Sequence, residues 1–390
     1  MILAAASLSL AAWIYLLFFH HRFWRGDQRL PSVFTPLTSW PSVVAVVPAR
    51  NEAETIGAVV SALRAQDYAG DLRIVVVDDA STDSTADLAR STPGVHSLDV
   101  ITAPPLEAGW TGKLWALNTG LTSIASYAPA YLWFTDADVV HPPATLSRLM
   151  AKAITDHRDL VSLMVRLRCE SFWERRLIPA FIFFFQMLYP FPATNDDTSS
   201  VAAAAGGCVL LRSEALSRAG GLAAIRGRII DDCALAAAIK KTGGRLWLGL
   251  SDASHSLRRA DTLEPLWSMV QRTAYTQLNH SIILLFLTVL ALAVIFLAPP
   301  VALLGLPWHR DVMTALVGLA AWVGITIAYG PTLRDYGRSA WEGGLLPGIA
   351  LLYTVMTLDS GVAHWRQKGG QWKGRHYGPS SSAGNLSKSP

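Results

Sequence analysis

Charged residues are scarce in this sequence. Asp, Glu, Lys and Arg make up 16% of its 390 residues, and 51% of the residues are hydrophobic. An ordinary soluble domain, by contrast, carries roughly 25% charged residues. The shortage of charge argues against a wholly soluble protein and indicates membrane segments attached to a folded domain.

The sequence also lacks a basic surface that could bind nucleic acid. Its formal net charge is +4, but many of the basic residues gather beside apolar runs. The positive-inside rule and anionic lipid headgroups account for that placement. We therefore expect a membrane, and no nucleic acid, as a partner. The residues concerned are Arg22, Arg25, Arg29, Arg366, Lys368, Lys373 and Arg375.

Cysteines are few as well. Cys169, Cys208 and Cys233 form no CxxC pair, which argues against a zinc site or a redox couple. An odd number of cysteines is most simply explained by a reducing compartment. We expect Cys233 to be a small buried filler rather than a nucleophile.

No charge interrupts residues 2–19, a run close to the roughly 20 residues that a membrane-spanning helix needs. A cleaved signal peptide would require a basic residue before the run, and none is present. The charges follow it, in residues 20–29. Residues 1–20 are therefore predicted to be an uncleaved anchor in the cytoplasmic (inner) membrane, with the N-terminus outside and the next domain in the cytoplasm.

Further apolar stretches predict a C-terminal membrane region over residues 281–360. Segment 172–192 is also apolar, but its charged start and its prolines favour an interfacial helix. Four spans would leave the basic tail, residues 361–390, outside the cell. The Lys and Arg of the tail favour three spans, with the last or the proline-broken segment re-entrant. The tip of the tail, residues 378–390, is expected to be disordered. The apolar stretches are residues 281–306, 312–329 and 343–358.

Between residues 41 and 280 the pattern is that of an α/β domain. Short β-branched runs alternate with helical stretches, which indicates a mostly parallel sheet covered on both faces. Ligands bind such sheets at the carboxyl ends of the strands, where polar clusters stand here. Asn51 and Glu54 have the spacing of a capping box for the first helix. The expected strands are residues 43–47, 73–79, 95–101 and 131–134, and the expected helices are residues 52–66 and 113–126.

Two carboxylates follow the last of these strands. Asp136 and Asp138 can hold a hard divalent cation, Mg2+ or Mn2+, which neutralises the phosphates of a nucleotide diphosphate. A DxD pattern alone is weak evidence, because acidic loop residues are ordinarily just solvated. Its position after a buried strand strengthens the prediction.

Two neighbouring strand ends carry further hydrogen-bond acceptors. Carboxylate and amide groups there suit the base and the ribose of a nucleoside. Such residues also make ordinary turns and helix caps, and the two roles are compatible. The donor-binding candidates at these two ends are Pro48, Asn51, Glu52, Asp78 and Asp79.

Two cations are predicted near the donor. Lys113 opens a helix, where the helix dipole favours anions, so it is a candidate phosphate ligand. An exposed lysine is the plain alternative. Arg272 could hold the diphosphate in a bidentate manner, although an arginine is also routine at a membrane interface.

A second acidic pair, Asp231 and Asp232, begins another helical stretch. A carboxylate that faces the donor can take the proton of an attacking hydroxyl. A single displacement then inverts the configuration at the anomeric carbon of the sugar. The alternative is an acidic first turn that complements the helix dipole. His255 is expected to be structural.

Six motifs in a fixed order resemble the family 2 glycosyltransferases over residues 41–280. The apolar ends of the chain and the tail motif QWKGRHYG resemble, within that family, the glycosyltransferases associated with hopanoid biosynthesis. Ceramide glucosyltransferases and carotenoid-pathway transferases are more distant. The six motifs are PARNEAETIGAVVSAL, VVVDDASTDST, TGKLWALNTG, DAD, GGCVLLRSEAL and IIDDCALAAAIKKTGG.

The resemblance implies a GT-A fold and a UDP-sugar donor, with metal at Asp138 and Asp136 nearby. It also implies that Asp79 binds the uracil and that Asp232 is the base. We therefore expect an inverting transfer of one sugar to a lipid hydroxyl, with a hopanoid as the favoured acceptor. A polyprenyl-phosphate acceptor and a non-catalytic membrane scaffold remain the alternatives.

The sequence departs from the family at two motifs. Asp231 stands where the family's paired Glu-Asp has its glutamate, which leaves the second carboxylate in place. The Gln-x-x-Arg-Trp motif of processive members is not intact, because Arg272 follows Gln271 directly. This departure argues against polysaccharide synthesis and leaves the role of Arg272 open.

Overall fold

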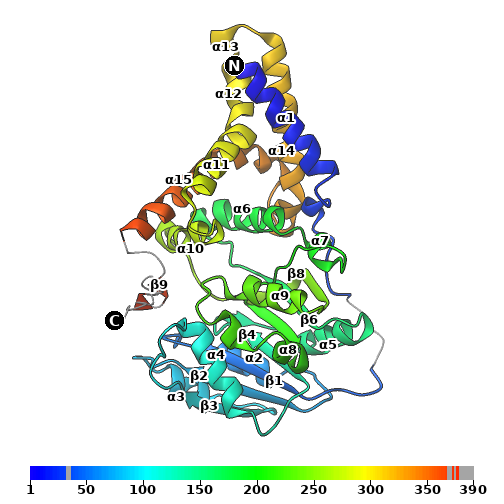
Figure 1. Ribbon diagram of the computed structural model, residues 1–390, viewed down its shortest axis with the longest axis vertical. Coiled ribbons are helices and arrows are strands. Elements are labelled where there is room, and N and C mark those ends of the chain that lie inside the picture. The colour runs from blue at the N-terminus through cyan, green and yellow to red at the C-terminus, as the bar shows by residue number, and fades with distance from the viewer. Residues whose placement is uncertain (32–36, 367–370, 373–374, 377–390) are drawn as a thin grey trace, which may run out of the picture.

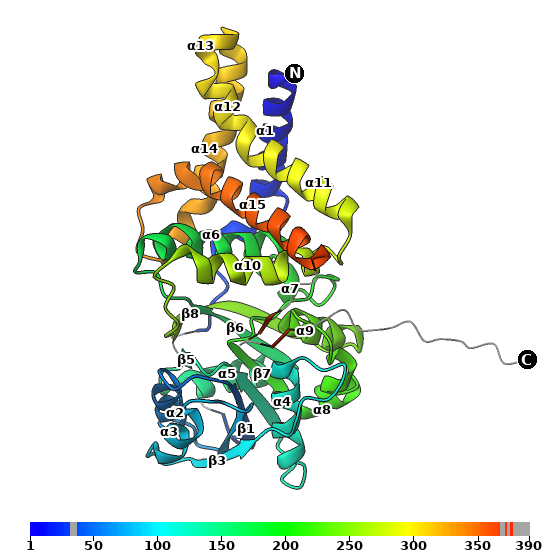
Figure 2. The same ribbon diagram turned by 90° about the vertical axis from the view of Figure 1, so that its left-hand side faces the viewer.

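The chain divides into a sheet domain and an arm of helices, with a layer of helices lying across the molecule between them (Figures 1 and 2). The computed structural model describes residues 1–31, 37–366, 371–372 and 375–376. The tip of the tail, predicted to be disordered, lies outside the described residues. Two short strands near the C-terminus, β9 (Gln371–Trp372) and β10 (Arg375–His376), pair antiparallel.

An eight-stranded sheet forms the core of the sheet domain, in the order β3-β2-β1-β4-β7-β6-β8-β5. The first four strands in this order are parallel neighbours, and β6 is parallel to β8. Strand β7 runs antiparallel to both of its neighbours, and β5 runs antiparallel to β8. The mostly parallel α/β fold expected from the sequence is confirmed, and it is a GT-A fold. The strands are β1 (Val43–Ala49), β2 (Leu72–Asp78), β3 (Ser97–Thr102), β4 (Tyr131–Thr135), β5 (Val139–Val140), β6 (Leu160–Arg166), β7 (Cys208–Arg212) and β8 (Leu246–Ser256).

Helices cover both faces of the sheet, which explains why its central strands are apolar throughout. Every residue of β1 is buried. Because side chains alternate along a strand, Val43, Ala45 and Val47 pack in one core with α2 and α5, whereas Val44 and Val46 pack in another with α4. The covering helices are α2 (Ile56–Arg64), α3 (Thr85–Ser91), α4 (Gly112–Ser123), α5 (Thr145–Thr155), α8 (Ser213–Arg218) and α9 (Asp231–Lys241).

The predicted capping box is wrong. Helix α2 begins at Ile56 with Thr55 as its N-cap, so Asn51 and Glu54 lie in the loop before it. The side chain of Asn51 accepts a hydrogen bond from the backbone N–H of Thr82 (2.8 Å). Asn51 therefore joins two loops and does not cap the helix.

The arm contains three helical segments long and apolar enough to cross a membrane, Ile282–Leu304, Val312–Asp335 and Ala340–Trp365. The N-terminal apolar helix α1 (Ile2–Phe18) is shorter and packs beside α14. Apolar side chains such as Ile283 and Phe286 are mostly exposed on this arm, as lipid-facing residues would be. The helices that make up these segments are α11 (Ile282–Leu292), α12 (Ala298–Leu304), α14 (Val312–Asp335) and α15 (Leu346–Trp365), with α13 (Leu306–His309) between the first two segments.

The transverse layer is formed by α6 (Phe172–Leu188) and α10 (Leu263–Gln277), next to the short helix α7 (Phe191–Asn195) (Figure 2). Helix α6 begins with a complete capping box between Ser171 and Glu174, and it accommodates Pro179. It lies across the direction of the arm helices (Figures 1 and 2). This orientation agrees with the interfacial helix expected at residues 172–192, whose membrane location remains a prediction.

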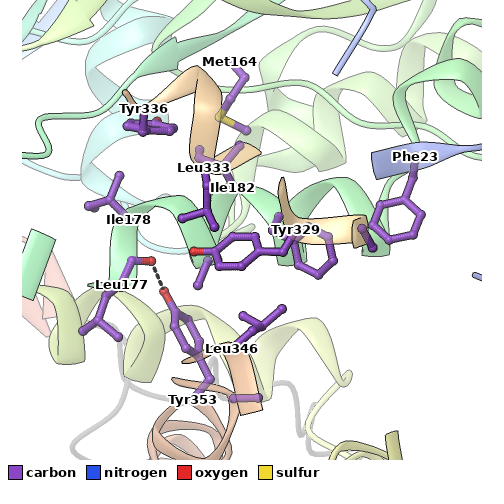
Figure 3. Packing of buried hydrophobic residues seen from close by; sticks show 14 of the residues in the cluster. Phe23, Met164, Leu177, Ile178, Ile182, Tyr329, Leu333, Tyr336, Leu346 and Tyr353 are labelled. Atoms are coloured by element: carbon purple, nitrogen blue, oxygen red, sulfur yellow. Dashed lines mark hydrogen bonds between the residues drawn. The ribbon is translucent and has the colours of Figure 1, made fainter. Parts of the chain in front are cut away.

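One apolar core joins the layer to both neighbours (Figure 3). Met164 of β6 reaches it from the sheet, Ile178 and Leu177 come from α6, and Tyr329 comes from α14. The hydroxyl of Tyr353, on α15, donates a hydrogen bond to the carbonyl of Leu177 (2.9 Å). The sheet domain and the arm are therefore held through α6, which places the upper rim of the sheet beside the transverse layer.

Candidate active site

Four strand ends meet at one rim of the sheet. Ala49, the last residue of β1, pairs with Asp78, the last residue of β2. Asp136 follows β4, which is the other neighbour of β1. The antiparallel strand β7 begins at this rim, because its first residue pairs with the last residue of β4. The expectation that the polar clusters share one edge of one sheet is confirmed.

Lys113 lies at the centre of this rim. Its Nζ is 2.8 Å from Asp136 Oδ1 and 3.4 Å from Asp231 Oδ2. A cation in the first turn of a helix is unfavourable by itself, because the helix dipole is positive there. Burial would lower the pKa of Lys113, but the charges of Asp136 and Asp231 outweigh it and hold that pKa well above its usual range. The lysine therefore stays charged and ties α4, β4 and α9 together.

Asp232 is held by backbone groups. Its Oδ2 accepts a hydrogen bond from the N–H of Gly206 (2.8 Å), and its Oδ1 accepts one from the N–H of Cys233 (2.7 Å). Burial, and secondly the neighbouring charge of Asp231, raise the pKa of Asp232 to about 6. This carboxylate is thus fixed in orientation and unusually basic.

A side chain at Gly206 would crowd the charged cluster. A Cβ at this position would lie 2.9 Å from Lys113 Nζ and 3.3 Å from Asp232 Oδ2. A Cβ here would therefore press on Lys113 and Asp232, just before β7. The GG pair before this strand was the available sequence signal, and no role was predicted for it.

These groups line an open pocket of about 340 Å³. Its polar wall comes from the charged cluster, and its apolar wall comes from α4, β4, β7, α9 and the helical turn Leu222–Ile225. Of the candidate residues, Pro48, Lys113, Asp136, Asp231 and Asp232 line it. A nucleotide diphosphate fits the chemistry of such a pocket, because it needs a cation for its phosphates and acceptors for its hydroxyls.

Asp138 faces a different cation. Its Oδ2 accepts hydrogen bonds from Ser256 Oγ (2.7 Å) and from Arg258 Nε (3.0 Å). Burial would raise the pKa of Asp138, but the Arg258 guanidinium and these hydrogen bonds hold it below its ordinary value. Arg258 also bonds Glu52 Oε1 through Nη2 (2.8 Å), so it joins two predicted site residues. A basic pair after a strand carries no sequence signal that would have identified it.

The loops after β1 and β2 are joined to each other. The backbone N–H of Asn51 donates to Ser81 Oγ (2.9 Å), and that of Glu52 donates to Thr85 Oγ1 (2.8 Å). Asp78 and Asp79 are buried beside this junction. The structure thus brings the candidate nucleoside ligands to neighbouring strand ends, although these two aspartates do not line the pocket.

The buried side chain of His141 supports the loop that carries Asp136 and Asp138. His141 Nε2 lies 2.8 Å from Thr135 Oγ1, and His141 Nδ1 lies 2.9 Å from Ser254 Oγ. Because Thr135 donates to the carbonyl of Gly207, it accepts from Nε2–H, and Nδ1 accepts from Ser254. Burial lowers the pKa of His141 to about 3. The ring therefore stays neutral and fixes β4, β7 and β8 relative to each other.

Arg272 is not among the residues that line the pocket. It lies on α10, in the transverse layer. On the same helix, Trp267 Nε1 and Gln271 Nε2 donate to Asp359 Oδ2 of α15 (2.7 and 2.6 Å). Gln271 and Trp267 therefore bind the arm, and a donor-binding role for Arg272 stays a prediction.

Comparison with known proteins identifies the sheet domain. The family model described as "Glycosyl transferase family 2" matches residues 44–220. An uncharacterised protein of Methanocaldococcus jannaschii is 31% identical over 118 residues, which are 30% of this chain and 44% of the relative. The match therefore spans less than half of that relative's length. Residues 44–220, a little under half of the chain, therefore match a family 2 glycosyltransferase domain.

Solved structures extend the comparison of the fold. A mannosyltransferase from Pyrobaculum calidifontis, in complex with GDP-Man and Mn2+, has a TM-score of 0.53 and 20% identity, and the match covers 93% of this chain and 98% of that chain. Glucosyl-3-phosphoglycerate synthase from Mycobacterium tuberculosis, in complex with Mn2+, UDP-glucose and glycerol 3-phosphate, has a TM-score of 0.40 at 20% identity. That match covers 61% of this chain and 79% of that chain. The first likeness concerns the fold alone, and the second is too distant to support an argument.

A double-mutant cycle tests the charged cluster. We expect Lys113→Met and Asp136→Asn each to lower the free energy of unfolding, and the double variant to lose less than the sum. The reason is that each single change leaves its partner's charge without compensation. The coupling should be about 0.5–3 kcal/mol, measured by chemical denaturation in detergent.

The control cycle uses Arg90 and Asp87, an ion pair at 3.0 Å whose side chains are 50% and 85% exposed. Such surface pairs contribute about 0–1 kcal/mol. A coupling at Lys113 and Asp136 no larger than the control would show that the cluster does not hold the site together.

Proposed function

We propose that the protein is a membrane-bound, inverting glycosyltransferase that moves one sugar from a nucleotide diphosphate donor to a lipid hydroxyl. The observation that carries the proposal is the pocket in which Lys113 joins Asp136 and Asp231 while Asp232 stands beside them. The polar wall of this pocket thus brings together a cation for a diphosphate and a basic carboxylate. A single-displacement transfer needs both groups on one site.

The donor lies along the rim. Asp78 and Asp79, with Pro48, Asn51 and Glu52, take the nucleoside at the ends of β1 and β2, and Lys113 takes the diphosphate. Resemblance to family 2 members favours UDP over other nucleotides. A role for Arg272 in holding the diphosphate would require α10 to approach the pocket.

A divalent cation suits the donor groups at this rim. The Arg258 guanidinium already stands as a cation between Asp138 and Glu52, so these hard oxygen donors hold positive charge. Asp138, with Asp136 nearby, would hold Mg2+ or Mn2+. The ion would neutralise the diphosphate and improve it as a leaving group. Among the described residues no three His, Cys, Asp or Glu form a metal cluster; Mg2+ typically takes its other ligands from phosphates and water.

Asp232 acts as the base. The acceptor oxygen forms a bond to the anomeric carbon of the sugar, and the bond from that carbon to the diphosphate oxygen breaks. The hydroxyl proton passes to Asp232, and the nucleoside diphosphate leaves. The acceptor attacks the face of the sugar opposite the leaving diphosphate, so the single displacement inverts the anomeric centre. Hydrogen bonds from Gly206 and Cys233 keep the carboxylate in place.

The acceptor comes from the membrane side. Tyr189, just after α6, lies beside Cys233, the neighbour of Asp232, and its hydroxyl accepts a hydrogen bond from Gln277 Nε2 of α10 (2.6 Å). The transverse layer therefore reaches the base. We propose that α6 lies at the cytoplasmic surface of the inner membrane, with the sheet domain in the cytoplasm. A hopanoid is the acceptor that resemblance favours.

The direct test incubates detergent-purified protein with UDP- and GDP-sugars, Mn2+ and extracted membrane lipids, and detects new glycolipid by mass spectrometry. We expect product from the wild type and at least about a hundredfold lower turnover from Asp232→Asn, because a general base contributes about 10²–10⁴-fold. Asp87→Asn, which removes an exposed carboxylate, should keep wild-type turnover.

Near-normal turnover of Asp232→Asn would favour a polyprenyl-phosphate acceptor, which needs no strong base. No product with any donor would favour a non-catalytic scaffold. In that case the binding of UDP would not depend on Mn2+ or on Asp138.

The pH dependence tests the base separately. A base must be ionised to accept a proton, and the pKa of Asp232 is raised to about 6. We therefore expect kcat/KM to be level above pH 6 and to fall as the pH drops below it. Asp231→Asn removes one cause of the raised pKa, so the acid limb should move to lower pH. A limb that stays in place or moves upward would contradict this assignment.

A further inference from the structure

Arg258 pairs with Asp138, the proposed metal ligand, and with Glu52. Its guanidinium bonds the carboxylate of Asp138 through Nε and that of Glu52 through Nη2. The side chains of Asp138 and Glu52 are only 10% and 12% exposed, whereas that of Arg258 is 52% exposed. Two largely buried carboxylates thus pair with the same cation, which reaches them from the solvent side.

The backbone around Arg258 is fixed on both sides. The N–H of Leu257 donates to the carbonyl of Asp138 (2.7 Å). Beyond Arg258, the N–H of Ala260 donates to buried Glu174 (2.7 Å), and Ser171 Oγ donates to the carbonyl of Ala260 (2.9 Å). The main chain is held between the sheet and α6. The half-exposed side chain of Arg258 can therefore move away from the carboxylates while the main chain stays in place.

We propose that Arg258 is a built-in counter-ion of Asp138 and Glu52 that keeps divalent metal away from Asp138 until a nucleotide diphosphate is bound. The proposal rests on the function proposed above, and it adds an order of events. Metal alone must displace a guanidinium held by two carboxylates. A diphosphate supplies oxygen ligands to the metal and, at the same time, an alternative anion with which the guanidinium can pair.

Three consequences follow from this proposal. The free enzyme binds Mn2+ weakly, because a protein cation already neutralises the carboxylates. Nucleotide and metal bind with positive coupling, since each favours release of the arginine for the other. Removing the arginine therefore strengthens the binding of metal alone, although it removes a cation that could pair with the diphosphate.

Calorimetry of Mn2+ binding tests this inference on the full-length protein in detergent, without nucleotide and with saturating UDP or GDP. We expect Arg258→Gln to bind Mn2+ without nucleotide at least about tenfold more tightly than the wild type, a difference of about 1.4 kcal/mol. The gain in Mn2+ affinity on adding nucleotide should be correspondingly smaller in this variant.

Arg259→Gln is the matched control, because it removes the same charge one residue away. Arg259 is 66% exposed, and its guanidinium lies 3.1 Å from Asp261. Its Mn2+ affinity should stay within about twofold of the wild type, since exposed charges are well screened. Arg258→Lys keeps the charge but not the fork that reaches two carboxylates. The Mn2+ affinity of this variant should lie between those of the wild type and Arg258→Gln. It replaces the glutamine variant in the test if that variant does not fold.

Equal Mn2+ affinity in the wild type and in Arg258→Gln would overturn the inference. If Asp138→Asn still abolished nucleotide-dependent Mn2+ binding, the proposed donor site would stand. Equal strengthening in Arg258→Gln and Arg259→Gln would reduce the effect to net charge and would also overturn it. Absence of Mn2+ binding in all variants, with either nucleotide, would overturn both the inference and the metal site of the proposed function.

Discussion

Lys113 stands between carboxylates that come from separate parts of the chain, and the geometry of the pocket depends on this contact. The lysine lies in the first turn of α4, Asp136 follows β4, and Asp231 begins α9. Without the cation, Asp136 and Asp231 would repel each other, because their charges lie too close together for solvent to screen them well. With it, Asp232 can be held close to the donor site, partly buried and basic. The same interaction thus assembles the site and prepares the base for its task.

The transverse layer connects this site to the arm. Helix α6 packs against α14 and α15 in one apolar core (Figure 3), and Glu174 at its start holds the loop that follows β8. That loop carries Arg258, and the chain then continues into α10. A change at the donor rim and a change in the layer therefore act on one short segment. This arrangement gives a physical basis for coupling between a soluble donor and an acceptor that arrives from the membrane.

The sequence predicted the rim because strand ends obey a simple rule. Runs of apolar residues identify parallel strands, and their carboxyl ends must share an edge, so Asp78 and Asp136 could be placed together. Strand β7 was not among the predicted strands, and its antiparallel direction could not have been read from a hydrophobic pattern, which carries no direction. Arg258 was missed, since its partners are distant in sequence. The capping box failed because Asn51 bonds the neighbouring loop, a tertiary contact that overrides a local pattern.

The central claim is that Lys113 binds the diphosphate at a site built by its carboxylate partners. Calorimetric titration of UDP and GDP into the wild type and into Lys113→Met, with Mn2+ present, tests it most directly. We expect at least about a tenfold loss of affinity in the variant for the nucleotide that the wild type prefers, about 1.4 kcal/mol. Equal affinities in the two folded proteins would contradict the claim.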